Sequence, residues 1–147
     1  MNKIAIPNDI MLAEVSRLLA EGRPVVIATK GNSMMPFIVG DRDSVELVRK
    51  DNYEVGDIVL SQISPGHWVL HRLFSIDAAS VVLKGDGNLT GTEKCRMEDI
   101  AGYAVSIIRP DGEVSCLTPR FVRRSARWRA LPYIVRRVYL AIFRRII

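Results

Sequence analysis

The sequence predicts a mainly β domain, built as a sandwich or small barrel, with an amphipathic helix before it and a basic helix after it. Three observations predict this class. Short β-prone runs alternate with turn residues over most of the chain, apolar residues recur at helical spacing near the N-terminus, and arginines mix with bulky apolar residues near the C-terminus. With 147 residues, 48% of them hydrophobic, the chain has the size of one domain with appendages.

The N-terminal region predicts one helix and one strand. Residues 7–9 (Pro-Asn-Asp) are typical of a helix start, and Gly22 is typical of a helix end. Between them, apolar residues repeat at helical spacing at Leu12, Val15, Leu18 and Leu19. We therefore expect an amphipathic helix of about three turns. The β-branched run 24–29 then predicts a buried strand that ends shortly before Ser33.

The middle of the chain predicts a series of short strands. The β-prone runs are 44–49, 57–63, 67–74, 80–84, 100–108 and 113–117. The separators 55–57, 64–66, 85–88 and 110–112 combine glycine with proline, aspartate or asparagine, which is ordinary turn chemistry. Short strands joined by tight turns favour a sandwich or small barrel.

Charge divides the chain at residue 119. Nine arginines lie between Arg120 and Ile147, and the first 119 residues hold the other 12 basic residues and all 16 acids, a net charge of −4. We therefore expect a main domain over 1–119, including the N-terminal helix, and a basic amphipathic tail over 120–147. This division argues against a uniformly basic domain that coats nucleic acid.

The tail predicts a final helix after Pro132, with arginines on one face and apolar residues on the other. The apolar face holds Leu131, Ile134, Val135, Val138, Tyr139, Ile142 and Ile146. Such a helix can lie in an anionic membrane surface, with Trp128 and Tyr133 as aromatic anchors. The alternative is a helix packed on the domain or on a partner protein. Nucleic-acid binding is weaker, because few aromatic residues interleave with the arginines.

The cysteines and the apolar segments predict the compartment. Cys95 and Cys116 lie in no metal-binding or disulfide pattern, so we expect free buried thiols in a reducing compartment, and no metal or organic cofactor is implied. Charged residues interrupt every apolar run near the N-terminus, and no segment has the length needed to span a bilayer. The expectation is a cytoplasmic protein, held peripherally on a membrane through its C-terminal helix.

Three short boxes carry the candidate chemistry: 31–36 followed by Gly40-Asp41, then 69–73, then 83–88. A serine nucleophile needs an adjacent base and backbone donors for the oxyanion. Ser33 lies in a glycine-flanked turn, and His71 is able to accept its proton and return it. Asp86 is a carboxylate that would fix the histidine tautomer. Taken singly, these residues read as a helix cap, a half-buried strand histidine and a turn residue; their combination and order favour catalysis.

The boxes resemble those of a known superfamily. The Ser-Met-x-Pro pattern at 33–36 with Gly40-Asp41 is similar to the nucleophile box shared by type I signal peptidases and LexA-like self-cleaving repressors, and 56–59 resembles the strand that follows it. His71-Arg72 stands where bacterial members have a lysine base and the archaeal and endoplasmic-reticulum signal peptidases have a histidine. Residues 84–88 are similar to the Lys-Gly-Asp-Asn box. The resemblance covers about residues 24 to 90.

This resemblance implies the β-rich signal peptidase and LexA-like catalytic fold, with Ser33 as nucleophile, His71 as general base and Asp86 orienting the histidine. It also implies that the backbone at Ser33 and Gly31 binds the oxyanion, although many relatives carry a second hydroxyl where Gly31 stands. Met34 and Pro36 of the same box are assigned to substrate binding.

Several residues compete for these roles. Histidine-type relatives carry a further aspartate where Thr92 falls, and Glu93 is the available substitute. His67 shares a strand face with His71 but lies beside a turn. The competing acids Asp41 and Asp57 each follow a glycine, as turn residues do. The lysines that could form a Ser-Lys pair are Lys30, Lys50 and Lys84.

The expected function is a serine endopeptidase that cleaves a peptide or protein precursor, as a maturation or leader-removing enzyme. Its substrate would be an extended peptide paired with a strand near the nucleophile, and the family implies small residues before the cut. One alternative is a LexA-like self-cleaving regulator, but no Ala-Gly or Cys-Gly precedes Ser33, and Ala101-Gly102 falls in a predicted strand. The other is a catalytically silent peptide-binding adaptor.

Overall fold

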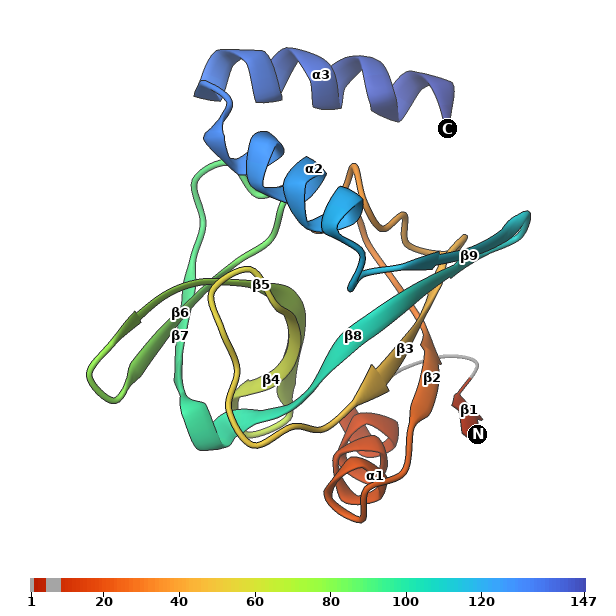
Figure 1. Ribbon diagram of the computed structural model, residues 1–147, viewed down its shortest axis with the longest axis vertical. Coiled ribbons are helices and arrows are strands. Elements are labelled where there is room, and N and C mark those ends of the chain that lie inside the picture. Colours follow the sequence, from red (N-terminus) through yellow and green to blue (C-terminus); the bar gives the residue numbers. More distant parts are fainter. Residues whose placement is uncertain (1, 5–8) are drawn as a thin grey trace.

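Nine strands form one sheet in the computed structural model, which describes residues 2–4 and 9–147 (Figure 1). The strands are β1 Asn2–Ile4, β2 Val25–Ala28, β3 Ser44–Val48, β4 Ile58–Ser64, β5 His67–Asp77, β6 Ser80–Lys84, β7 Glu93–Arg96, β8 Ile100–Arg109 and β9 Gly112–Ser115. The helices are α1 Asp9–Ala20, the 3-10 turn Met97–Asp99, α2 Pro119–Ala130 and α3 Tyr133–Ile146. The mainly β prediction is confirmed.

The strands lie in the order β1-β2-β3-β8-β4-β5-β6-β7, and β9 also pairs with β8. All neighbours are antiparallel except β1 and β2, which are parallel. Within the described ranges the two end strands, β1 and β7, do not pair with each other, so the sheet is not closed into the small barrel that was one expectation. The predicted strand runs correspond to β2 to β6, β8 and β9, while β1 and β7 were not predicted.

Alternating burial explains why these runs form strands. In β3 every second residue is buried, with Val45 and Leu47 fully inside, and β8 alternates in the same way over most of its length. One core cluster joins α1 to the sheet and to the loop after β2, and a second cluster lies around Leu73 and Leu83 on β5 and β6.

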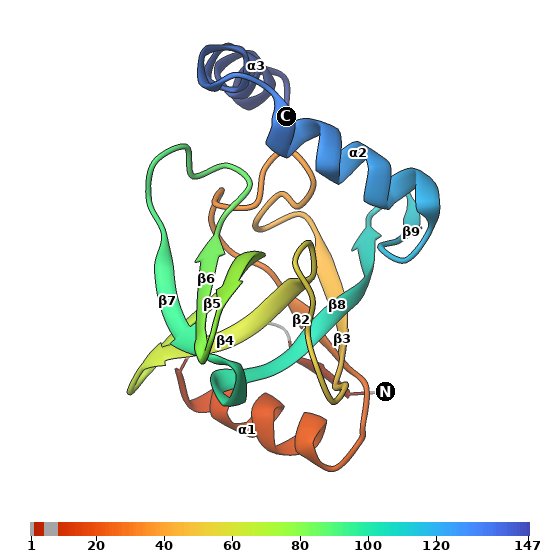
Figure 2. The same ribbon diagram turned by 60° about the vertical axis from the view of Figure 1, so that its left-hand side comes forward.

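The helices lie at opposite ends of the sheet, with α1 at one end and α2 and α3 at the other (Figures 1 and 2). α1 matches the predicted helix from Asp9 onward, while the expected helix-start residues Pro7 and Asn8 lie outside the described residues. The helix buries Val15 and Leu19 and is followed by Gly22 in a left-handed conformation, with φ of 84°. The Gly22 amide donates to the Leu19 carbonyl at 2.9 Å, which closes the helix end.

The C-terminal region packs on the domain through α2. Thr118 caps this helix by accepting a hydrogen bond from the Phe121 amide, and Pro119 begins it. Phe121 and Trp128 belong to the same core cluster as α1 and β2. α3 differs, because Leu140 is its one buried residue among those described. None of the helices in the described part of the chain is both long and apolar enough to cross a membrane.

Candidate active site

Ser33 and His71 line the same cleft, which has a volume of about 310 Å³. The end of β2 and the loop after it line the cleft through residues 27–31, and β5 lines it through residues 68–71. The other lining residues are mostly apolar and comprise Leu12, Met34, Ile38 and Leu60. The structure therefore brings the predicted nucleophile and the predicted base, which lie 38 positions apart in sequence, to one concave site.

Two glycines and an aspartate fix the loop that carries Ser33. Gly31 has a positive φ of 74°, and a β-carbon at Gly40 would lie 2.1 Å from the Gly31 carbonyl oxygen, so only glycine fits there. The Gly40 amide donates to that oxygen at 3.0 Å, and the Asp41 amide donates to the Thr29 carbonyl at 2.8 Å. The Gly-Asp pair thus closes the loop, and Asp41 has the turn role expected of it.

Gly85 lies where the Ser33 loop and His71 meet. A β-carbon at this position would lie 2.3 Å from the Ser33 carbonyl oxygen and 3.2 Å from Cδ2 of the His71 ring. The Gly87 amide donates to the same Ser33 oxygen at 2.8 Å, and the Asn88 amide closes the turn on the Gly85 carbonyl at 2.9 Å. The box 85–88 therefore holds the Ser33 backbone against the strand that carries His71, and its glycines permit that approach.

His71 is buried, with 6% of its surface exposed, and it is held by an acid. Its Nδ1 lies 2.5 Å from Oε1 of Glu93, which is the first residue of β7. When Glu93 is ionised, Nδ1 carries the ring proton and Nε2 is left as the acceptor. This is the arrangement that a general base needs.

Asp86, which we expected to orient His71, has a different partner in the structure. Its carboxylate binds Arg72, with Nη2 to Oδ2 at 2.5 Å and Nε to Oδ1 at 3.2 Å. Both side chains are buried, at 3% and 1% exposure. Asp86 forms no hydrogen bond or ion pair with His71 among the described residues: its lone pairs satisfy a buried guanidinium, and the alternative acid Glu93 contacts the histidine. Arg72 also donates to the Gly56 carbonyl at 2.9 Å, which ties the pair to the turn before β4.

Ser33 is half-buried at the cleft wall. No hydrogen bond joins its hydroxyl to His71 in the described chain, a geometry that often tightens only when substrate binds. The Ser33 amide has no acceptor among the described residues, so it is free to donate to an oxyanion. Gly31 also lines the cleft, and its left-handed backbone turns the chain toward Ser33.

The two predicted substrate-binding residues lie in different places. Met34 is buried and lines the cleft beside Ser33. Pro36 lines a separate cavity next to α2 and α3 and is not among the described residues that line the cleft.

The competing acids and bases have other environments. His67 is exposed at the start of β5, as expected of a turn position. Asp57 accepts from the Glu54 amide at 2.9 Å and pairs with Lys50 at 2.7 Å. Lys84 lies over the Phe74 ring. Of the candidate lysines, Lys30 lines the cleft, with an exposed side chain.

Trp128 is a site-supporting residue that the sequence did not reveal. Its Nε1 donates to the Asp86 carbonyl at 2.9 Å, and its side chain is 5% exposed. The indole thus attaches α2 to the 85–88 box. In the sequence, an aromatic residue in a basic segment predicted a membrane anchor and gave no sign of this contact with the 85–88 box.

Comparison with known proteins adds no assignment: no protein-family model matches the chain, and no curated protein matches it.

Proposed function

We propose that this protein is a serine endopeptidase of the histidine-type signal peptidase kind, with Ser33 as nucleophile and His71 as general base. The observation that carries the proposal is the shared cleft, in which Ser33 lies beside a buried histidine whose Nδ1 is held by Glu93. A superfamily resemblance over about residues 24 to 90 supports it, because residues of its nucleophile and base boxes line this cleft and Gly85 of its Lys-Gly-Asp box lies against Ser33 and His71.

The proposed reaction follows the chemistry of acyl transfer. Nε2 of His71 takes the Ser33 hydroxyl proton as Oγ attacks the scissile carbonyl carbon, and the Ser33 amide donates to the resulting oxyanion. Glu93 stabilises the imidazolium that forms. His71 then gives the proton to the leaving amine, and a water deprotonated by the same ring hydrolyses the acyl-enzyme and restores Ser33.

The proposed substrate is an extended peptide segment of a precursor protein. Backbone from residues 27–31 and from residues 68–71 lines the cleft, so a peptide lying between them has strand-like partners for its amides and carbonyls. The apolar lining residues Ile27, Leu60 and Leu70 favour uncharged side chains near the cut.

The proposal places the enzyme in a reducing, cytoplasmic compartment, on a membrane surface. Cys95 and Cys116 are free and buried, as is usual where thiols stay reduced. The apolar face of α3 is exposed, at 65% for Ile134, 58% for Ile142 and 75% for Ile146. A continuous apolar helix face with arginines beside it is typical of interfacial attachment.

A peptide-binding adaptor is the second candidate, favoured by the missing hydrogen bond between Ser33 and His71. A LexA-like self-cleaving regulator has less support. Its candidate scissile bond, Ala101-Gly102, lies within β8, where Gly102 pairs with Leu60. A peptide bond held inside the sheet is out of reach as a substrate.

A mixed-peptide library tests the proposal. Purified wild type should cleave a subset of peptides, and Ser33→Ala and His71→Ala should each lower the rate by at least about a thousandfold. Lys30→Gln is the matched control at the cleft and should retain activity. A phosphonate that modifies activated serines should label wild type at Ser33 and leave His71→Ala unlabelled. Tight peptide binding without cleavage or labelling would favour the adaptor, and loss of activity in Lys30→Gln would indicate a Ser-Lys enzyme.

A further inference from the structure

A second, larger cavity lies between the domain and the two C-terminal helices, with a volume of about 670 Å³. We call it the arginine cavity, because four guanidinium groups line it: those of Arg42, Arg109, Arg124 and Arg127. It is separate from the cleft, and none of the cleft-lining residues lines it. The catalytic proposal gives this cavity no role.

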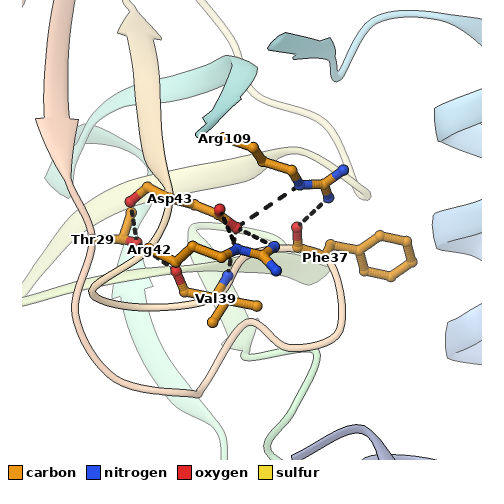
Figure 3. Close-up of polar contacts among 6 residues, drawn as sticks. All are labelled: Thr29, Phe37, Val39, Arg42, Asp43 and Arg109. Atoms are coloured by element: carbon orange, nitrogen blue, oxygen red, sulfur yellow. Dashed lines mark hydrogen bonds and ion pairs between the residues drawn. The ribbon is translucent and has the colours of Figure 1, made fainter. Parts of the chain in front are cut away.

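Two of these arginines share one buried carboxylate (Figure 3). Arg42 binds Asp43 with Nε to Oδ1 at 2.8 Å and Nη2 to Oδ2 at 3.0 Å, while Nε of Arg109 lies 3.9 Å from the same Oδ2. The Asp43 carboxylate also accepts from the Val39 amide at 2.8 Å. Arg109 donates to the Phe37 carbonyl, but its buried Nε has no hydrogen-bond partner among residues 2–4 and 9–147. Asp43 therefore neutralises one of the two positive charges.

The other two arginines bring charge that no protein group offsets. Arg124 and Arg127 project from α2, are exposed, and form no ion pair with any residue of the described ranges. Asp111, at the turn between β8 and β9, is the one acid that lines the cavity in the described chain. Four guanidinium groups against Asp111 and Asp43 leave an excess of two positive charges, which a phosphate group matches in charge and in geometry.

The remaining walls are apolar and aromatic. Trp128, Leu131, Tyr139 and Phe143 line the cavity, with Trp128 and Tyr139 in edge contact at 5.3 Å and Tyr139 stacked on Phe143 at 6.1 Å. Tyr139 and Phe143 belong to α3, the helix whose exposed face carries Ile134 and Ile142. An inorganic anion would use only the guanidinium groups, whereas an amphiphile uses both kinds of wall.

We propose that the arginine cavity binds the phosphate group of an anionic phospholipid, whose glycerol and upper acyl chains contact the aromatic wall. This inference rests on the membrane-surface part of the proposed function and is independent of the peptidase chemistry. In this proposal, attachment depends on a site that binds one headgroup phosphate at the membrane surface, and not only on a general attraction between the arginines and negative charge.

Vesicle binding tests the site. The vesicles are phosphatidylcholine alone, or phosphatidylcholine mixed with an equal amount of phosphatidic acid. The pocket variant Arg124→Gln/Arg127→Gln is compared with Arg144→Gln/Arg145→Gln, which removes the same charge from α3 outside the cavity. If the arginines act only through general electrostatic attraction to the membrane, both variants should partition to the acidic vesicles about thirtyfold more weakly than wild type. A phosphate held by two guanidinium groups predicts about a 300-fold loss for the pocket variant. Equal losses in the two variants would overturn the site.

Two further arms separate the possible failures. Val138→Asp/Ile142→Asp on the exposed face of α3 should abolish binding to both vesicles. Retained binding in this variant would rule out attachment through that face of α3. Inorganic phosphate separates a lipid source from a free ion. We expect millimolar phosphate to compete with acidic vesicles for wild type only weakly. Tight phosphate binding in solution, with no difference between the two arginine variants on vesicles, would assign the cavity to a soluble phosphate. Cleavage of a soluble peptide should be unchanged in both arginine variants.

Discussion

At the scale of single residues, two acids near the site have separate duties. Glu93 contacts the histidine ring, and Asp86 contacts the guanidinium of Arg72. His71 and Arg72 are neighbours on β5, and adjacent strand residues point to opposite faces. An acid that contacts one of these two side chains therefore lies on the opposite face of β5 from the other. We expect substitutions in the Glu93–His71 pair and in the Asp86–Arg72 pair to have different effects.

We expect Glu93→Gln to lower kcat by about a hundredfold with little loss of stability, because the amide no longer compensates the imidazolium. Steady-state kinetics on a cleaved peptide and a urea denaturation curve measure both effects. Glu98→Gln is the matched control, since Glu98 pairs with Arg96 at an exposed site. Unchanged kcat in Glu93→Gln would remove Glu93 from the site.

Asp86→Asn should act on stability. The substitution leaves the guanidinium of Arg72 buried and unpaired, which costs about 3 to 5 kcal/mol of unfolding free energy. The substitution also affects Arg129. Burial, and then the charge of nearby Arg72, lower the pKa of the Arg129 guanidinium, whereas the charge of Asp86 opposes that shift. Loss of the Asp86 charge therefore adds to the destabilisation. Urea denaturation measures the loss. A stable Asp86→Asn with no activity would return Asp86 to the catalytic role first expected of it.

The site residues differ in how far the sequence could predict them. The glycine-flanked turn and the order of the boxes predicted Ser33 and His71, which the structure brings to one cleft. Glu93 was only an alternative, because β7 reads Glu-Lys-Cys-Arg and lacks the β-prone pattern that would have announced a strand beside β6. Which residue Asp86 contacts depends on the face of β5 from which the His71 and Arg72 side chains project. Similarity of short sequence boxes to those of a family does not give that orientation.

At the scale of elements, α2 makes the first part of the C-terminal region a piece of the domain core. Composition divided the chain at residue 119, whereas Phe121 and Trp128 lie in the core cluster with α1 and β2. Phe121 packs edge-on against Phe37 of the Ser33 loop, with ring centroids 5.6 Å apart. Arginine content hid this, because the buried side chains of α2 are few: among the described residues of this helix, only Phe121, Ser125 and Trp128 are buried. α3 retains the amphipathic, exposed character that its sequence predicts.

Trp128→Phe tests whether α2 supports the 85–88 box at the candidate site. Phenylalanine keeps most of the packing but removes the hydrogen bond to the buried Asp86 carbonyl, a loss of about 1 to 3 kcal/mol of unfolding free energy. We expect kcat to fall, with KM nearly constant, because Gly85 and Gly87 flank that carbonyl and contact the Ser33 loop. Tyr133→Phe, at an exposed position of α3, is the control. A stability loss with unchanged kcat would limit Trp128 to a structural role.

At the scale of the whole molecule, the sequence predicted the strands but not their order. Turn residues and β-branched runs are local signals, and they located seven of the nine strands that the described part of the chain contains. The pairing of β3 and β4 with β8 joins residues 39 to 64 positions apart, and no local pattern encodes it. The same non-local pairing leaves Cys116 buried beneath α2, beside Arg72 and Phe121.

Burial of Cys116 predicts how stability depends on alkaline pH. Burial raises the pKa of its thiol to about 12 from an ordinary value of 9.0, against the weaker opposing effect of Arg72 and Arg109. The folded state therefore favours the protonated thiol, while the unfolded chain ionises above pH 9. This stability is fully present below pH 9 and is lost progressively between pH 9 and pH 12.

At pH 10 the ionised unfolded state lowers the free energy of unfolding by about 1.4 kcal/mol relative to pH 8 through this one thiol. Cys116→Ala removes that contribution, so urea denaturation of the variant should change less between the two pH values than that of wild type. The variant also creates a small cavity, but that cost is the same at both pH values, so the pH difference isolates the thiol. Cys95 and Tyr53, whose pKa values burial also raises, act in the same direction and remain in both proteins. An equal pH difference in wild type and variant would mean that the Cys116 thiol ionises as easily in the folded protein as in the unfolded chain, and would contradict its burial under α2.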